Sequence, residues 1–218
     1  FFIENQDIEH SKKLEFILKS LKTESISFHA SYRYFRLTCS DEKWDLMEND
    51  FKKSIEICKE HNGEFLVLHT NEGLPGEVMD KGILEKRIQK LIKLGKEKEV
   101  KVVIENVGIG KNILYNQEEY IELIKKYNFD SLIDIGHAIA NNWDLDKVIT
   151  ELKENIIAYH FHNNDGEKDL HKSIYDGKAD YERIISLVKE NTPEANIVLE
   201  YSAATPKREI LETLEKLS

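Results

Sequence analysis

Short apolar runs rich in β-branched residues alternate with longer, charged, amphipathic runs along the whole chain, and this alternation limits the possible folds most strongly. The apolar runs have the length of buried strands, and the runs between them suit helices that cover a sheet. Such alternation is typical of repeated βα units, which predicts an α/β fold with a parallel sheet. The predicted strands are residues 1–4, 25–29, 65–69, 101–105, 131–134, 156–162 and 196–200, and the predicted helices are residues 10–21, 44–60, 83–98, 118–127, 145–153, 181–189 and 208–217.

These seven strands, each followed by a helix, predict a TIM (β/α) barrel with one unit out of sight. A closed barrel of this kind has eight strands. We therefore expect the first βα unit to be missing or to precede Phe1, with the open edge covered by an upstream strand or by a partner chain, such as a second copy. No linker or low-complexity segment divides the sequence, so we expect residues 1–218 to form a single domain.

Composition narrows the classes of partner and the cellular compartment. The 218 residues carry 41 acidic and 31 basic side chains, a formal charge of -10, which disfavours nucleic acid as a partner unless bound metal ions add local positive charge. Cys39 and Cys58 are the only cysteines, too few for a disulfide framework or a thiolate zinc motif. The sequence has no signal-peptide pattern and no apolar run that would span a bilayer. We expect a cytoplasmic protein without a membrane partner.

Six of the seven predicted strands end in, or next to, a residue type that binds metal ions. In a parallel barrel the carboxyl ends of all strands meet at one mouth, so these side chains should converge. A single histidine at a strand end is more often a hydrogen-bonded structural residue. A glutamate that follows three apolar residues is different, because burying its charge is costly unless the carboxylate is paired or coordinated. The six residues are His29, His69, Glu105, Asp134, His162 and Glu200.

Two local clusters add candidates near the same mouth. His137 follows Asp134 by three residues, where a strand gives way to a loop. His160 and His162 share a strand face, because side chains alternate with period two, and only one of them need be a ligand. Asp169 and His171 lie in a polar segment that either reaches back over the mouth or is an ordinary solvated loop.

The motifs Ile104-Glu105-Asn106, Asp134-Ile135-Gly136-His137, His162-Asn163-Asn164-Asp165 and Leu199-Glu200 resemble those of the xylose isomerase-like TIM-barrel superfamily. That superfamily includes sugar isomerases, sugar epimerases and the endonuclease IV group of abasic-site nucleases. The resemblance covers residues 25–200, and residues 1–5 look like the family's second strand. It implies that one divalent ion, of Zn, Mn, Co or Mg, is held by Glu105, Asp134, His162 and Glu200.

As a sugar or sugar-phosphate isomerase or epimerase, the enzyme would bind adjacent substrate oxygens to the metal and pass through an enediolate. The resemblance then implies that Glu105 and Glu200 move the substrate proton and that His137 contacts a substrate oxygen. The acidic charge and the short mouth loops favour this interpretation.

The alternative is a zinc phosphodiesterase acting on abasic DNA, like endonuclease IV, with up to three ions. The further ligand positions implied by that resemblance are also filled, by His29, His69, His137, Asp169 and His171. Against it, the loop over residues 30–40 and the loop after His69 look too short for DNA-penetrating elements. A non-catalytic, sugar-binding barrel is a third and weaker interpretation.

Overall fold

The computed structural model describes residues 1–23, 25–70 and 78–217, and the greater part of the loop after His69 therefore lies outside the described residues. The chain divides into two compact units, Phe1–Ile104 and Glu105–Ser218, and each is described by itself. The expectation of a single domain over residues 1–218 stays a prediction. No helix among the described residues is long and apolar enough to cross a membrane.

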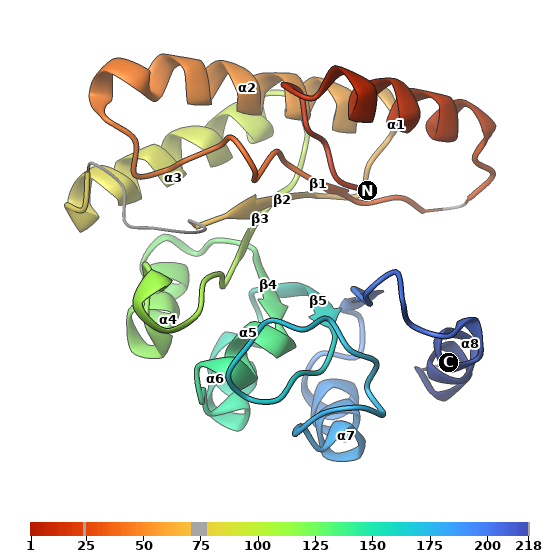
Figure 1. Cartoon of the computed structure of the whole chain (residues 1–218). Coiled ribbons are helices and arrows are strands. Elements are labelled where there is room, and N and C mark those ends of the chain that lie inside the picture. The colour runs from red at the N-terminus through yellow and green to blue at the C-terminus, as the bar shows by residue number, and fades with distance from the viewer. Residues whose placement is uncertain (24, 71–77, 218) are drawn as a thin grey trace. The chain divides into compact units, whose positions relative to one another are not determined.

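The first unit contains three parallel strands in the order β1-β2-β3. Phe28 of β1 lies opposite Leu66 of β2, and the Leu66 amide donates to the Lys101 carbonyl, 2.8 Å away, just before β3. Figure 1 shows the helices of this unit along one side of these strands. The elements are α1 (Ile8–Ser20), β1 (Phe28–His29), α2 (Asp41–Glu60), β2 (Leu66–His69), α3 (Lys81–Glu97) and β3 (Val102–Glu105), the last of which ends at the boundary between the units.

The strand predicted over residues 1–4 is reduced to a single parallel bridge between Phe2 and His29. The His29 amide donates to the Phe1 carbonyl at 2.7 Å and the Ile3 amide donates to the His29 carbonyl at 2.8 Å, but the ladder goes no further. It stops because the chain turns within the next residues and enters α1, whose first turn is capped by the Asp7 side chain. The described residues therefore contain six strands where seven were predicted.

The second unit contains three parallel strands in the order β4-β5-β6. β5 is central, with His160 opposite Asp134 on β4 and opposite Val198 on β6. Helices α4, α6 and α7 are preceded by the N-cap residues Asn116, Asp144 and Asp180, whose side chains accept hydrogen bonds from the first-turn amides. The elements are the short 3-10 helix η1 (Gly110–Asn112), α4 (Gln117–Tyr127), β4 (Ser131–Asp134), α5 (Ile135–Ala140), α6 (Leu145–Leu152), β5 (Ile156–Phe161), α7 (Tyr181–Asn191), β6 (Asn196–Leu199) and α8 (Lys207–Leu217).

Candidate metal centre

The carboxyl ends of the strands in the second unit carry the predicted ligands. Asp134 is the last residue of β4, His162 follows the last residue of β5, and Glu200 follows the last residue of β6. Glu105, where this unit begins, is the last residue of β3. Glu105, Asp134 and His162 are fully buried, whereas the Glu200 side chain is 19% exposed. Because parallel strands end at one edge, residues that are distant in sequence meet there.

A first group, the carboxylate cluster, consists of Glu105, Asp134, His160 and Glu200, whose candidate ligand atoms all lie within 4.8 Å of one another. His160 Nδ1 lies 3.1 Å from Glu105 Oε1, 3.2 Å from Glu200 Oε2 and 3.8 Å from Asp134 Oδ2. Burial alone lowers the pKa of His160, but the adjacent Glu105 and Glu200 carboxylates outweigh it and raise that pKa well above its usual value. Three acidic side chains therefore surround one imidazole.

A second group, the histidine cluster, consists of His137, Asp169 and His171. Asp169 Oδ2 lies 3.3 Å from His137 Nε2 and 3.1 Å from His171 Nε2, so one carboxylate oxygen serves two imidazoles. The His162 ring stacks on the His171 ring at a centroid distance of 4.3 Å, and its Nε2 lies 3.7 Å from Asp169 Oδ1. The polar segment with Asp169 and His171 is thus folded back onto the strand ends.

Asp134 joins the two clusters. Both of its carboxylate oxygens lie 3.0 Å from His162 Nε2, and Oδ1 also accepts a hydrogen bond from the His137 amide at 2.6 Å as the N-cap of α5. Asn106 holds the backbone of Asp134 through two hydrogen bonds, one to its carbonyl at 3.0 Å and one from its amide at 2.7 Å. His137 and His162 outweigh burial and lower the pKa of Asp134, so this carboxyl is ionised.

Gly136 leaves the space that the His162 ring occupies. A Cβ atom built at Gly136 would lie 1.9 Å from Cε1 of His162, and all three closest atoms belong to that ring. Any larger residue would therefore displace the ring from Asp134.

Backbone carbonyls fix the tautomers of the histidine cluster. His137 Nδ1 lies 2.9 Å from the Asn106 carbonyl, and His171 Nδ1 lies 2.9 Å from the Glu200 carbonyl. A carbonyl only accepts, so each Nδ1 carries the proton, and a neutral ring would turn the lone pair of Nε2 toward Asp169. Two acceptors then face each other, an arrangement that a proton or a metal cation must resolve.

The pKa shifts show how protons resolve this conflict without a metal. Burial alone lowers the pKa of His171, but its hydrogen bond to Asp169 outweighs burial and raises that pKa to about 9. The pKa of His137 is raised well above its usual value by Asp134 and Asp169 against the effect of burial. Burial raises the pKa of Asp169, but hydrogen bonds from His137 and His171 lower it strongly overall. In the absence of a metal, each protonated imidazole supplies the positive charge beside Asp169.

The donor set fits divalent metal ions. Ligand atoms at ~2.0–2.2 Å from one ion are separated by about 3–3.6 Å, which is the range of most contacts in both clusters. Nδ1 of His162 is buried and has no hydrogen-bond partner among the described residues, so this ring has a nitrogen available for a ligand bond. Imidazole and carboxylate donors without thiolates suit zinc, manganese or cobalt.

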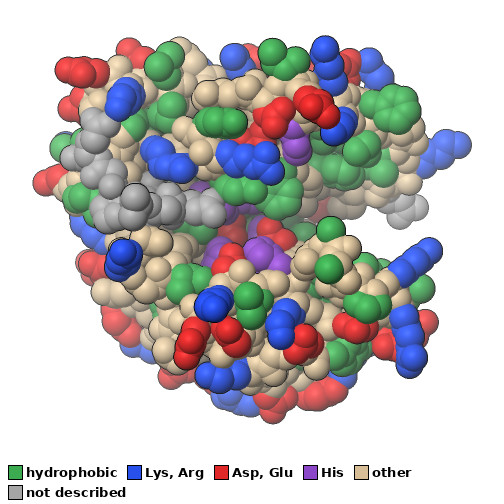
Figure 2. Space-filling view, in the orientation of Figure 1, with side chains coloured by type: hydrophobic (Ala, Val, Ile, Leu, Met, Phe, Trp, Pro, Cys, Tyr) green, Lys and Arg blue, Asp and Glu red, His purple; other side chains and the backbone are tan. Residues whose placement is uncertain are grey.

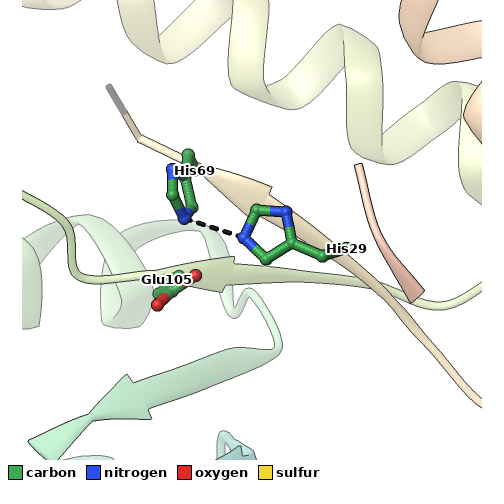
Figure 3. A group of neighbouring side chains, drawn as sticks. All are labelled: His29, His69 and Glu105. Carbon is green, nitrogen blue, oxygen red and sulfur yellow. Dashed lines mark hydrogen bonds between the residues drawn. The ribbon is translucent and has the colours of Figure 1, made fainter. Parts of the chain in front are cut away.

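The first unit places His29 and His69 together at the ends of β1 and β2. Their Nε2 atoms are 2.8 Å apart, and His29 Nδ1 lies 2.7 Å from the Ala30 carbonyl. Figure 3 shows the two rings turned toward each other across this contact. The Tyr32 ring flanks both imidazoles, at centroid distances of 5.5 Å and 5.6 Å. This pair is a candidate for two nitrogen ligands, with the tautomer of His29 fixed in the same way as in the histidine cluster.

The loop over residues 30–40 is packed against its own unit. Arg87 of α3 donates to the carbonyls of Leu37 and Cys39 at 2.6 Å and 2.7 Å, and its guanidinium lies over the Trp44 ring. Leu37 and Phe35 are buried. The segment therefore packs against its own unit and does not project from it.

The surface charge is mixed. On the face shown in Figure 2, basic and acidic side chains are interspersed, without a broad field of Lys and Arg.

His160 is the residue of the carboxylate cluster that was left out of the predicted ligand set. The group that contains both glutamates has His160 as its imidazole, whereas His162 lies between Asp134 and the histidine cluster. The period-two alternation of the strand had placed both rings on one face, and this was the available signal. Choosing between them needed the register of β5 against its neighbours.

Comparisons with known proteins identify the family. A profile of the family described as xylose isomerase-like TIM barrel matches residues 6–218. An uncharacterized protein of Methanocaldococcus jannaschii is 24% identical over 152 residues, which are 67% of this chain and 50% of that protein, so the match spans only half of the relative's length.

Three solved structures are similar in fold at low sequence identity. A D-tagatose 3-epimerase-like protein has a TM-score of 0.78 at 20% identity, with 97% of this chain and 82% of that chain covered. The IOLI protein with a bound zinc atom has a TM-score of 0.72 at 19% identity, covering 99% and 86%. Endonuclease IV from Thermus thermophilus has a TM-score of 0.69 at 17% identity, covering 97% and 81%. The predicted fold and resemblance are confirmed: this chain belongs to the xylose isomerase-like TIM-barrel family.

Proposed function

We propose that this chain is a divalent-metal-dependent hydrolase of phosphate esters that works with more than one bound ion. The observation that carries the proposal is the histidine cluster beside the carboxylate cluster in the same unit. Proton transfer in a sugar needs one ion, and the three carboxylates of the carboxylate cluster, together with His162 beside Asp134, already supply four donor groups for it. Two imidazoles with fixed tautomers around Asp169, the buried His137 and the partly exposed His171, form a second donor set. This favours the phosphodiesterase alternative over the isomerase that the sequence had favoured.

Bound divalent ions supply positive charge and Lewis acidity at a phosphoryl oxygen. Glu105 and Asp134, which are fully buried, are suited to hold an ion rather than to exchange protons with solvent. Glu200 is partly exposed, so its carboxylate is placed to take the proton of the attacking water as the new P–O bond forms. The ester P–O bond breaks on the opposite side, and its oxygen regains a proton from solvent. Without cations the carboxylate cluster would repel a phosphate, so the activity depends on metal.

A sugar or sugar-phosphate isomerase or epimerase is the second candidate. It is favoured by the position of Glu105 and Glu200, which approach one imidazole from different strands at 3.1 Å and 3.2 Å. Two carboxylates that face a common centre suit the removal and return of a substrate proton. In that reaction His137 would contact a substrate oxygen, and one ion per chain would suffice.

Metal content and substrate panels separate the two candidates. We expect two or three zinc or manganese ions per chain by elemental analysis, with hydrolysis of an abasic-site duplex or of bis(p-nitrophenyl) phosphate. His171→Ala should lower the ion content by one and reduce hydrolysis about 10- to 100-fold. His10→Ala is the matched control, because His10 contacts the Phe2 carbonyl outside both clusters. One ion per chain, together with turnover of a ketose or ketose phosphate, would overturn the hydrolase and support the second candidate.

A further inference from the structure

We infer that His160 is a positioning residue whose Nδ1 holds the carboxylates of Glu105 and Glu200 in place. The inference rests on the metal dependence in the proposed function, but it holds for either reaction. His160 is 5% exposed, and its Nδ1 is at hydrogen-bond distance from both carboxylates. Nothing in the ligand set implied by the family resemblance assigns it this role.

The strand register places His160 at the level of Asp134 and two residues below His162 and Glu200. Asp134 ends β4, and His162 and Glu200 each follow the end of their strand, whereas His160 lies within β5, two residues before His162. Its Cα is opposite Val198, which is two residues before Glu200. A side chain at this depth reaches the Glu200 carboxylate from the interior side of the strand ends, and its Nδ1 contacts Glu105 at the same point.

The charges of the cluster explain why such a residue is needed. Glu105 and Asp134 are fully buried and Glu200 is largely buried, so three carboxylates repel one another in a medium that screens poorly. A bound ion would neutralise them only if each carboxylate turned the correct oxygen toward it. One N–H group shared between Oε1 of Glu105 and Oε2 of Glu200 fixes the rotation of both side chains. Ligating carboxylates that lack such outer contacts bind metal more weakly.

The geometry also distinguishes His160 from the two histidines of the histidine cluster. In His137 and His171, Nδ1 donates to a backbone carbonyl and Nε2 points toward Asp169. His160 instead directs Nδ1 toward two carboxylates. A side chain that replaces the Nδ1–H donor alone should therefore preserve its role.

The test uses the full chain with Zn²⁺ and Co²⁺ as probes. In His160→Asn the amide nitrogen stands near the position of Nδ1, whereas in His160→Gln it stands near Nε2. We expect His160→Leu and His160→Gln to weaken metal affinity about 10- to 100-fold with unchanged ion content at saturation, and His160→Asn to stay within about threefold of the wild type. In all three variants, the visible spectrum of the Co²⁺ protein should show the same nitrogen ligands as in the wild type. His162→Leu is the comparison in which a nitrogen ligand is lost.

The variants that fold are compared by circular dichroism before titration, and the Asn and Gln pair tests the inference even if the Leu variant does not fold. Wild-type metal affinity in His160→Gln would overturn the inference. A lower ion content in His160→Asn, or a Co²⁺ spectrum of that variant with one nitrogen ligand fewer, would also overturn it, because either result would make His160 a ligand. A wild-type protein that binds no divalent metal would overturn the proposed function, and this inference with it.

Discussion

The carboxylate cluster and the histidine cluster lie in one unit and meet where Asp134 of the first contacts His137 of the second, but their charge balance differs. The first contains three acidic side chains around one imidazole. The second contains one carboxylate between two imidazoles, each with Nδ1 bound to a carbonyl. Protons can neutralise the second cluster, as the raised pKa of His171 indicates. The first keeps an excess of negative charge, so it depends more strongly on a bound cation.

The largest expected difference between the clusters is in turnover. Glu200→Gln should reduce turnover about 10²- to 10⁴-fold while leaving the fold intact, because the group that exchanges the proton is lost. Asp169→Asn, the matching change in the histidine cluster, should reduce it about 10- to 100-fold. Steady-state kinetics on the substrate found active, with circular dichroism as the folding control, measure both. Near-normal turnover in Glu200→Gln would remove Glu200 from the mechanism.

Metal removal should destabilise the protein through the carboxylate cluster. An ion present at about 1,000 times its dissociation constant contributes about 4 kcal/mol, so chelation should lower the melting temperature by roughly 8–16 °C. In Glu105→Gln the decrease in melting temperature on chelation should be smaller, because one buried negative charge has been removed. Thermal unfolding with and without EDTA gives both values. Equal melting temperatures for the wild type in the two conditions would contradict the expected dependence on a cation.

The contact between the clusters should be sensitive to a single methyl group. Gly136→Ala places a Cβ in the His162 ring, and overpacking of this kind costs about 1–3 kcal/mol of unfolding free energy. Displacement of His162 from Asp134 should also weaken metal binding. Gly82→Ala in α3 is the control, since its closest neighbour is the Asp80 side chain at 3.2 Å. Denaturant unfolding compares the two, and a neutral Gly136→Ala would show that the His162 ring can move without loss.

The smallest expected effect is the pH dependence of the metal-free protein. The pKa of His171 is raised to about 9, so its charged contact with Asp169 stabilises the fold fully below the unfolded pKa of about 6.5. That contribution is lost as pH rises through about 9, and because the side chain is 34% exposed it amounts to on the order of 1 kcal/mol. Unfolding at pH 6 and pH 10 in EDTA measures it. In His171→Ala the unfolding free energy should change less between pH 6 and pH 10. The same change in the variant as in the wild type would show that other groups cause the pH dependence.

Local sequence determined much of the fold and the chemistry of the site. Apolar runs that end in Glu105, Asp134 and Glu200 predicted both parallel strands and converging polar groups, because burial and strand direction act on each run separately. The Asp and Asn residues that cap α4, α6 and α7 likewise lie next to the helices they begin. The sequence did not predict that the strand over residues 1–4 is reduced to a single bridge, because the length of a strand ladder depends on where the chain turns away from its partner.

Tertiary structure alone decided how the histidines divide between the two clusters. His160 and His162 have the same residue type and share a face of the strand predicted over residues 156–162, so the sequence does not distinguish them. The register of β5 against β4 and β6 brings His160 to Glu105 and Glu200 and leaves His162 beside Asp134 and His171. The tautomers of His137 and His171 are set by carbonyls about 30 residues away in the chain. Residue type fixed which atoms can bind a cation, and packing between strands fixed which of them face the same point.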